Sequence, residues 1–351
     1  MAEESVRNEI SQLGKHSLIS KLTEDIQIKD STTKVGVGDD AAVVRFDGKT
    51  TVCATKLFVE NIHFDLTYFP LKHLGYKCVG IAVSDILAMN AMPHQVTVNL
   101  AVSNRFSIEA VEELMTGVKA FCHNYKLDLA GLDITSSATG LAISVTALGT
   151  AKEERIVKRA GTQEHELICV SGDFGAAYTG LLILQREKQI FEATHNSQPD
   201  LQGYEYLLER QLKPEPRVDI VEELQKNDIL PTAMTVVSDG LASSLFHLCN
   251  LSGLGCTIFE NKTPVDQLTF DTLRSLKIVA TTVALNGGED YELLFTIKQN
   301  DYEKVQKIEN VSVIGYMGEK NGARCLISND NRQIELKAQG FIEQEKEKSD
   351  K

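Results

Sequence analysis

The spacing of apolar residues along the chain switches repeatedly between a period of two and a period near 3.6, and this switching constrains the fold most. Residues 95–103 alternate between apolar and polar side chains, as in a strand with one buried face. Ser107 then precedes apolar residues at helical spacing, which predicts a helix capped by that serine. Interleaving of this kind predicts an α+β fold.

The same switching extends over both halves of the chain. In the first half it predicts strands at 50–55, 128–131 and 141–147 and a long apolar helix from about Leu71 to Asn90. In the second half it predicts strands at 167–170, 235–237, 291–297 and 312–316, and helices from about Ala176 to Arg186, after Pro214–Pro216, and from about Leu241. Residues 187–204 are polar and predict a loop.

The basic, polar stretch 151–161 separates the two halves and predicts a domain boundary. A length of 351 residues also suits two domains. We therefore expect an N-terminal domain over 1–152, a C-terminal α+β domain over 153–342 and a charged tail over 343–351.

Composition excludes several classes of protein. With 36 Lys and Arg against 49 Asp and Glu, the net charge is −13, which argues against a general nucleic-acid binder. No apolar run reaches the length of about 18 residues that a membrane span needs, and the polar start is not a signal peptide. The seven cysteines are scattered and never in CxxC spacing, which predicts reduced thiols in a cytoplasmic protein.

Two short motifs resemble nucleotide-binding sequences, but each fails a physical test. Asp47-Gly48-Lys49-Thr50 contains GKT, yet Val43 stands where a P-loop needs its first glycine, so we interpret Asp-Gly as a hairpin turn. The stretch 36–41, GVGDDA, would put two carboxylates where a dinucleotide pyrophosphate must approach. The same acids make sense if Mg²⁺ lies between them and a phosphate.

Several acidic residues sit beside glycines or in apolar segments, and they suggest shared metal binding. They are Asp39, Asp40, Asp85, Asp133, Asp239, Glu289 and Asp290. Asp85 is the most informative, because a lone buried carboxylate costs several kcal/mol and needs a partner. Structural alternatives remain open: a buried salt bridge for Asp85, a turn for Asp133 and a helix N-cap for Asp239.

The order of the motifs, rather than any single motif, identifies a family. Over roughly residues 10–342 the chain carries GVGDDAAVV, VENIHFDL, SDILAMNA, GLDITSS, KRAG, LKPEPR, SDGL and GGEDYELLF, in that order. This set resembles the thiamine-monophosphate kinase family of the aminoimidazole ribonucleotide synthetase-like superfamily. The resemblance implies ATP-dependent phosphorylation of thiamine monophosphate to thiamine diphosphate. It also implies a two-domain fold and a homodimer whose N-terminal domains, which bind ATP and Mg²⁺, join their sheets into a barrel.

The resemblance also implies roles for individual residues. Mg²⁺ ligands are implied at Asp40, Thr55, Asp85, Asp133 and Asp239. ATP contacts are implied at Tyr125, Leu132, Asp133, Arg159 and Ser238, and substrate contacts at His63, Glu289 and Phe341. Mg²⁺ is then the expected cofactor and ATP the co-substrate. No protein nucleophile is expected, because the acceptor phosphate is already anionic and catalysis depends on positioning and charge neutralisation.

Three residues depart from the pattern that this family implies. Lys56 and Val236 each stand where the family has a metal-binding aspartate, and Leu132 stands where it has a glycine near the phosphates. Two unit charges 4 Å apart interact by about 4 kcal/mol at an effective dielectric of 20, so Lys56 opposes a neighbouring divalent ion. The lysine could instead serve as counter-charge to a phosphate, or turn to solvent and leave an inactive site.

Two functions follow from these observations. The first is a cytoplasmic thiamine-monophosphate kinase, a homodimer that uses ATP and thiamine monophosphate and binds neither nucleic acid nor membranes. The second is a catalytically degenerate member of the same family that binds a nucleotide or a thiamine phosphate. Under either function we expect Asp40, Asp85 and Asp239 to converge on one cleft, with Lys56 pointing into it.

Overall fold

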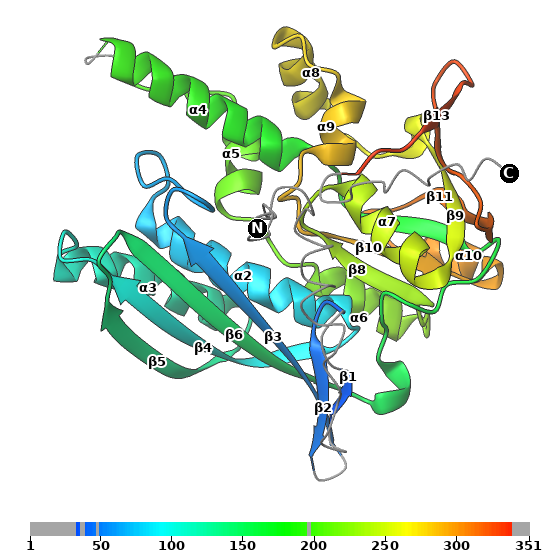
Figure 1. Cartoon of the computed structure of the whole chain (residues 1–351), viewed down its shortest axis with the longest axis horizontal. Helices are drawn as coiled ribbons and strands as arrows, with labels where there is room; N and C mark the ends of the chain where they lie inside the picture. The colour runs from blue at the N-terminus through cyan, green and yellow to red at the C-terminus, as the bar shows by residue number, and fades with distance from the viewer. Residues whose placement is uncertain (1–32, 36–38, 47–48, 195–197, 339–351) are drawn as a thin grey trace, which may run out of the picture.

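Two mixed β-sheets pack against the same helix, α2 (Leu71–Ala88), in the computed structural model of the chain (Figure 1). The structure describes residues 33–35, 39–46, 49–194 and 198–338. Phe341 and the tail predicted over 343–351 lie outside these residues. The mixture of sheets and helices confirms the predicted α+β class.

The first sheet contains the strands of the N-terminal half. Its order is β1 (Thr33–Val35), β2 (Ala42–Phe46), β3 (Lys49–Val59), β6 (Leu141–Ala151), β4 (Met92–Val102) and β5 (Asp128–Ser136). Neighbours are antiparallel except β4 and β5, which are parallel. Phe46 pairs with Lys49, which is the hairpin pairing predicted from the Asp-Gly motif.

Helices α2 and α3 (Ile108–Asn124) cover one face of this sheet, and no described helix covers the other (Figure 1). The Ser107 hydroxyl accepts a hydrogen bond from the backbone N–H of Ala110, which confirms the predicted cap. Gly75 and Gly117 let the two helices approach closely: a Cβ at Gly75 would lie 2.1 Å from the Leu114 carbonyl oxygen.

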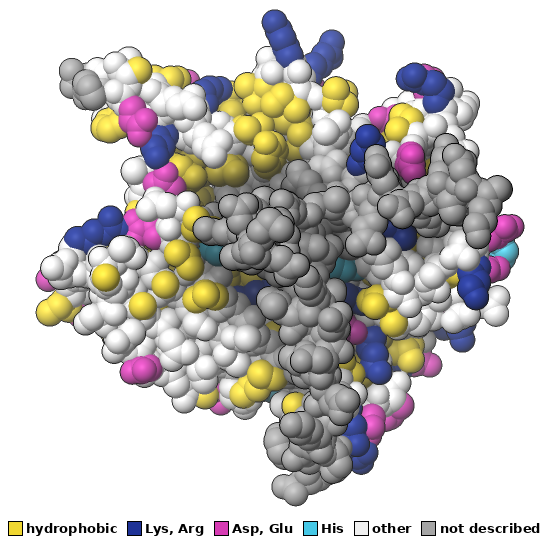
Figure 2. Space-filling view, in the orientation of Figure 1, with side chains coloured by type: hydrophobic (Ala, Val, Ile, Leu, Met, Phe, Trp, Pro, Cys, Tyr) yellow, Lys and Arg dark blue, Asp and Glu magenta, His cyan; other side chains and the backbone are white. Residues whose placement is uncertain are grey.

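The second sheet contains the strands of the C-terminal half. Its order is β13 (Gln333–Glu335), β12 (Arg324–Ile327), β9 (Leu254–Phe259), β11 (Val311–Lys320), β7 (Leu167–Ser171), β10 (Glu292–Ile297) and β8 (Ala233–Val237). The helices of this half are α4 (Ala176–Thr194), α5 (Glu205–Leu212), α6 (Val218–Lys226), α7 (Leu241–Ser252), α8 (Gln267–Ser275), α9 (Ala280–Asn286) and α10 (Tyr302–Val305). Figure 2 shows hydrophobic side chains gathering where α4, α8 and α9 meet, and charged side chains scattered around the rim.

The main error of the sequence prediction concerns the polar stretch 187–204. Helix α4 does not end near Arg186 but continues to Thr194. Glu187 explains the difference: its buried carboxylate pairs with Arg186 and accepts a hydrogen bond from the backbone N–H of Asp200. Glu187 is thus buried because the backbone at Asp200 supplies a hydrogen-bond partner. The spacing of residues within the helix does not reveal such a partner.

Helix α2 is buried along almost its whole length, from Leu74 to Ala88. It is enclosed by α3, by β3, β4 and β6 of the first sheet, and by β8 of the second. Two charged residues, Lys77 and Asp85, therefore lie inside the protein, each 3 % exposed. Within the described part of the chain, no helix is long and apolar enough to cross a membrane.

Candidate functional site

An ion pair joins the first sheet to α2. The Lys56 ammonium on β3 lies 2.7 Å from Asp85 Oδ2, with the carboxylate side chain 5 % exposed and the lysine 31 %. Burial raises the pKa of Asp85, against the lowering effect of Lys56. Burial likewise disfavours the charge of Lys56, but Asp85 outweighs it and raises the pKa of the ammonium. The buried salt bridge foreseen for Asp85 is thus confirmed.

A second ion pair lies beside the first, between Asp40 and Arg159. Arg159 Nε donates to Asp40 Oδ2 at 2.8 Å, and its NH2 group donates to Oδ1. The Thr235 hydroxyl on β8 donates to the same Oδ1 at 3.1 Å, and the Asp40 side chain is wholly buried. The backbone N–H of Arg159 contacts the Asp39 carboxylate, whose pKa is raised by burial. Two-nitrogen pairing of this kind is strong and directional.

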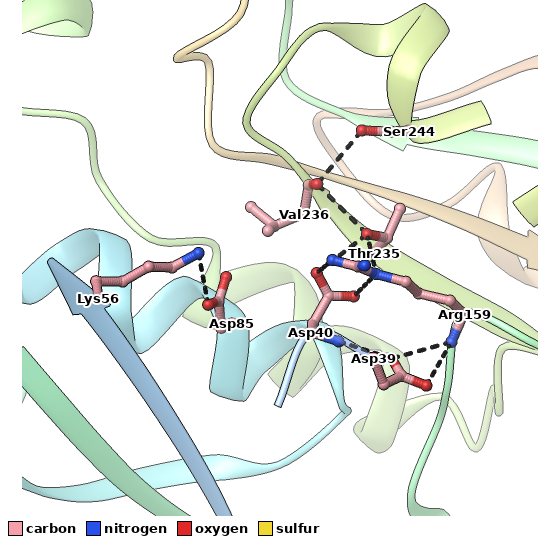
Figure 3. Close-up of polar contacts among 8 residues, drawn as sticks. All are labelled: Asp39, Asp40, Lys56, Asp85, Arg159, Thr235, Val236 and Ser244. Atoms are coloured by element: carbon pink, nitrogen blue, oxygen red, sulfur yellow. Dashed lines mark hydrogen bonds and ion pairs between the residues drawn. The ribbon is translucent and has the colours of Figure 1, made fainter. Parts of the chain in front are cut away.

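Figure 3 shows the two ion pairs side by side, with the Val236 side chain directed to the side of Lys56 and Asp85. Asp40 and Arg159 both act electrostatically on Lys56 and Asp85. Val236 is 4 % exposed on β8. The pairs therefore form one charged cluster between β3, α2 and β8, in which each carboxylate has a cation of its own.

This cluster does not fit a resident Mg²⁺ ion. Magnesium needs free carboxylate or carbonyl oxygens, but Asp85 is bound to Lys56 and Asp40 is bound to Arg159 and Thr235. Val236 adds no oxygen ligand. Across the described residues, no three His, Cys, Asp or Glu side chains are placed to hold a metal. The Mg²⁺ ligand set that the family implies stays a prediction, and the structure does not bring these ligands together.

Thr55 and Asp133 lie on the other face of the first sheet. Neighbouring residues of a strand point to opposite sides, so Thr55 faces away from α2 when Lys56 faces it. Asp133 is paired with Asn99 on β4, and both are exposed. Since β6 and β4 separate β3 from β5, the structure does not bring Asp133 to the ion pairs. It lies within strand β5, so the turn interpretation is wrong; Leu132, beside it, is 47 % exposed.

A small cavity of about 40 Å³ lies next to α2 and brings together two of the predicted substrate contacts, His63 and Glu289. The backbone N–H of Val59 donates to His63 Nδ1 at 3.0 Å. Glu289 Oε2 lies 2.6 Å from Lys77 Nζ, which also donates to the Gln211 carbonyl at 2.6 Å. Sequence reasoning missed Lys77, although a lysine inside an apolar helix gives the same signal as Asp85.

A strained turn holds Glu289 in place. Gly288, Glu289 and Tyr291 have positive φ angles of 75°, 63° and 52°, which is costly for the two residues with side chains. The Glu289 N–H donates to the Ser238 carbonyl at 2.7 Å and the Tyr291 N–H to the Val237 carbonyl at 2.9 Å. The turn before β10 is thereby joined to the end of β8.

Asp239 lies at the same junction, half-buried between β8 and α7. The N-cap of α7 is Gly240, with a φ of 99°, so the N-cap alternative for Asp239 is wrong. Burial raises the pKa of Tyr291, and the charges of Glu289, Asp239 and Asp85 raise it further. Asp239 therefore lies within electrostatic reach of the cavity, together with Glu289 and Asp85.

Tyr125 contacts residues that do not belong to the two ion pairs. Its hydroxyl donates to the Glu215 carboxylate, which also accepts a 2.8 Å hydrogen bond from Tyr76. Its ring stacks on Phe121 with centroids 4.5 Å apart. Burial raises the pKa of Tyr125. An adenine contact by this residue stays a prediction, as does the substrate contact by Phe341.

Comparison with known proteins gives a consistent result. The family described as "AIR synthase related protein, N-terminal domain" matches residues 38–151. The thiamine-monophosphate kinase of Buchnera aphidicola subsp. Acyrthosiphon pisum is 30% identical over 330 residues, 92% of this chain and 97% of that protein. The Bacillus subtilis protein of the same name is 29% identical over 321 residues, 90% and 94% of the two chains. A solved structure, "AaThiL complexed with AMPPCP and TMP", is 27% identical with a TM-score of 0.79, covering 96% of this chain and 100% of that one.

Proposed function

Because the chain belongs to the thiamine-monophosphate kinase family, we propose that it transfers a phosphoryl group from ATP to thiamine monophosphate. The products are thiamine diphosphate and ADP. The observation that carries the proposal is the similarity, over 96% of the chain, to a structure complexed with AMPPCP and TMP. His63 and Glu289, the two described residues with an implied substrate contact, lie at one place in the fold, which supports substrate binding there.

In the proposed reaction an oxygen of the thiamine phosphate attacks the terminal phosphorus of ATP, and the bond to the bridging oxygen of ADP breaks. No protein nucleophile is needed, so the chain contributes orientation and positive charge. Arg159, held by Asp40 and Thr235, and Lys56, held by Asp85, support charge neutralisation near the transferred group. Mg²⁺ enters as part of the MgATP substrate in this proposal.

We further propose that the protein is a homodimer built through its first sheet. Among the described strands, β5 is an edge of that sheet, where Leu132 and Ile134 are 47 % and 52 % exposed, and edge strands favour pairing with another chain. The face that carries Thr55 and Asp133 has no described helix over it (Figure 1). A dimer would cover this face and give both residues new neighbours. Light scattering should return twice the mass of one chain, and Leu57→Lys, which puts a charge on the face of Thr55, should return a single mass.

We also propose that the chain has two domains and that the protein is cytoplasmic. Strand β6 ends at Ala151 in the first sheet and β7 begins at Leu167 in the second, which supports a domain division near residue 152. All seven cysteines are free thiols, which supports a reducing, cytoplasmic location.

The test is direct. Purified protein is incubated with ATP, MgCl₂ and thiamine monophosphate, and thiamine diphosphate is measured by chromatography. We expect product formation that His63→Ala reduces, while Lys226→Met, an exposed lysine on α6, leaves it unchanged. The absence of product with a folded protein that binds ATP would contradict the kinase proposal.

A second function is favoured by one specific observation: both cluster carboxylates are neutralised, and Val236 supplies no ligand. A protein with these features could bind the nucleotide or thiamine phosphate without transferring the phosphoryl group. The double variant Lys56→Asp/Val236→Asp discriminates between the two functions. If it turns over and the natural chain only binds, the binding function holds; if both turn over equally, the natural site is unimpaired.

A further inference from the structure

The side chains of the cluster balance each other's charges. Lys56 holds Asp85 at 2.7 Å, and Arg159 holds Asp40 through two nitrogens. A divalent ion that approached Asp85 would have to displace Lys56 or bind next to it. Like charges repel strongly in a partly buried site, because the effective dielectric there is far below that of water.

Two features fix Lys56 in this position. It pairs in register with Val145, a buried residue on β6, so its side chain leaves β3 on the helix side, toward Asp85. Val236, 4 % exposed, has its side chain directed to the side of the pair (Figure 3). An apolar group in that place offers Lys56 no competing oxygen partner.

Lys56 is nevertheless reachable from outside. Its side chain is 31 % exposed, whereas that of Asp85 is 5 % exposed. An ammonium carries three hydrogen-bond donors, and the ion pair with Asp85 uses one of them. Donors therefore remain for the oxygen atoms of a phosphate, with which lysine pairs as a compact point charge.

We propose that Lys56 is a built-in cation of this site. It occupies the place beside Asp85 at which a divalent ion would otherwise bind, and it supplies positive charge to the phosphates of the bound substrate. The first part depends only on the ion pair. The second part rests on the proposed function, because it needs a phosphate ligand in the cleft.

The first experiment measures Mn²⁺ binding to the full chain without nucleotide, by electron paramagnetic resonance. We expect Lys56→Asp to bind one Mn²⁺ at least tenfold more tightly than any site of the natural chain, since it gives Asp85 a second carboxylate. Lys226→Met serves as the matched control for loss of a lysine and should behave as the natural chain. An equal affinity in the natural chain and in Lys56→Asp would overturn the first part.

Two carboxylates side by side could prevent folding, so circular dichroism accompanies each titration. If Lys56→Asp is unfolded, Lys56→Met decides, because it frees Asp85 without adding a charge. We expect Lys56→Met to bind Mn²⁺ more tightly than the natural chain; unchanged affinity would overturn the first part.

The second experiment measures ATP binding by calorimetry in EDTA. We expect the natural chain and Lys226→Met to bind ATP, and Lys56→Met to bind it at least tenfold more weakly. ATP binding by the natural chain that is absent in EDTA, or unchanged in Lys56→Met, would overturn the second part. Neither experiment measures product, so a protein that passes both without forming thiamine diphosphate contradicts only the proposed function.

Discussion

Two of the regions in which the chain buries charged residues are built in opposite ways. Between the two sheets, two carboxylates have one cation each: Lys56 for Asp85 and Arg159 for Asp40. Both cations are partly exposed, at 31 % and 19 % of their side chains. Charges arranged in this way can be shared with a ligand that enters from solvent.

The second region lies around β10, and its charged groups pair with one another inside the protein. Glu292 is 1 % exposed and is shared by Arg210, at 2.9 Å, and Arg217, at 3.5 Å. Asp290 beside it is wholly buried and accepts a hydrogen bond from the backbone N–H of Gly175 at 3.1 Å. Burial raises the pKa of Asp290 to about 7, although Arg210 lowers it. Of these two regions, only the first has cations that a ligand from solvent can reach, because Arg210 and Arg217 are less exposed, at 12 % and 16 %.

The largest expected effect concerns the second region. Arg210→Met should lower the free energy of unfolding by about 3 kcal/mol, because it leaves Glu292 and Asp290 buried with one cation fewer. Urea unfolding measures the loss. A change below about 0.5 kcal/mol, the size expected at an exposed pair, would show that the region does not depend on this charge.

The next effect concerns pH. In the folded protein Asp290 has a pKa of about 7, above its ordinary value, so folding favours its protonated form. Its contribution to stability is therefore complete in acid and is lost as the pH rises through about 7. Asp290→Asn should be more stable than the natural chain by on the order of 2 kcal/mol at pH 8, and the difference should vanish near pH 4. Thermal melting across this range measures it; a difference that does not change with pH would refute the assignment.

A smaller effect on stability is expected at the Lys56–Asp85 pair, where removing one charge differs from removing both. Lys56→Met should destabilise the protein by about 1–2 kcal/mol, because Asp85 is left buried without its partner, although solvent near the lysine reduces the loss. Lys56→Met/Asp85→Leu should recover most of that stability, since replacing a whole buried pair by apolar groups is often neutral. Urea unfolding of the three proteins provides the comparison. If the double variant is no more stable than Lys56→Met, the loss in the single variant does not come from the unpaired Asp85 carboxylate.

The smallest effect lies on the surface. Arg332 and Asp330 form an ion pair with 75 % and 55 % of their side chains exposed. Arg332→Met should change stability by less than about 0.5 kcal/mol, because water screens such pairs. A loss comparable to that of Arg210→Met would remove the contrast between exposed and buried charge.

Much of the fold follows from local spacing in the sequence. The Ser107 cap, the apolar run of α2 and the alternation of β4 are all present as predicted, since each depends on residues within one element. The end of α4 was not predictable in this way, because Glu187 is buried by a partner from Asp200, outside the helix. Strand order is likewise a property of long-range pairing.

The site was predictable where one residue's chemistry demanded a partner. Asp85 in an apolar helix required a partner, and a buried salt bridge was one of the alternatives; Lys56, expected to point into the cleft, supplies it. The grouping of Thr55 with Asp85 neglected a rule available from sequence alone: Thr55 and Lys56 are consecutive in a strand and must face opposite sides. Lys77 was missed because no family motif drew attention to it, although it is as deeply buried as Asp85.

Lys77 and Asp85 share one further property, which is that both belong to α2. Eight residues of an α-helix rise about 12 Å, so α2 sets a fixed spacing between the cavity residue that holds Glu289 and the carboxylate that holds Lys56. The close packing at Gly75 and Gly117 prevents the helix from sliding freely past α3. A change that moves α2 therefore shifts Lys77 and Asp85 together. The position of Glu289 and that of Lys56 cannot be adjusted separately through this helix.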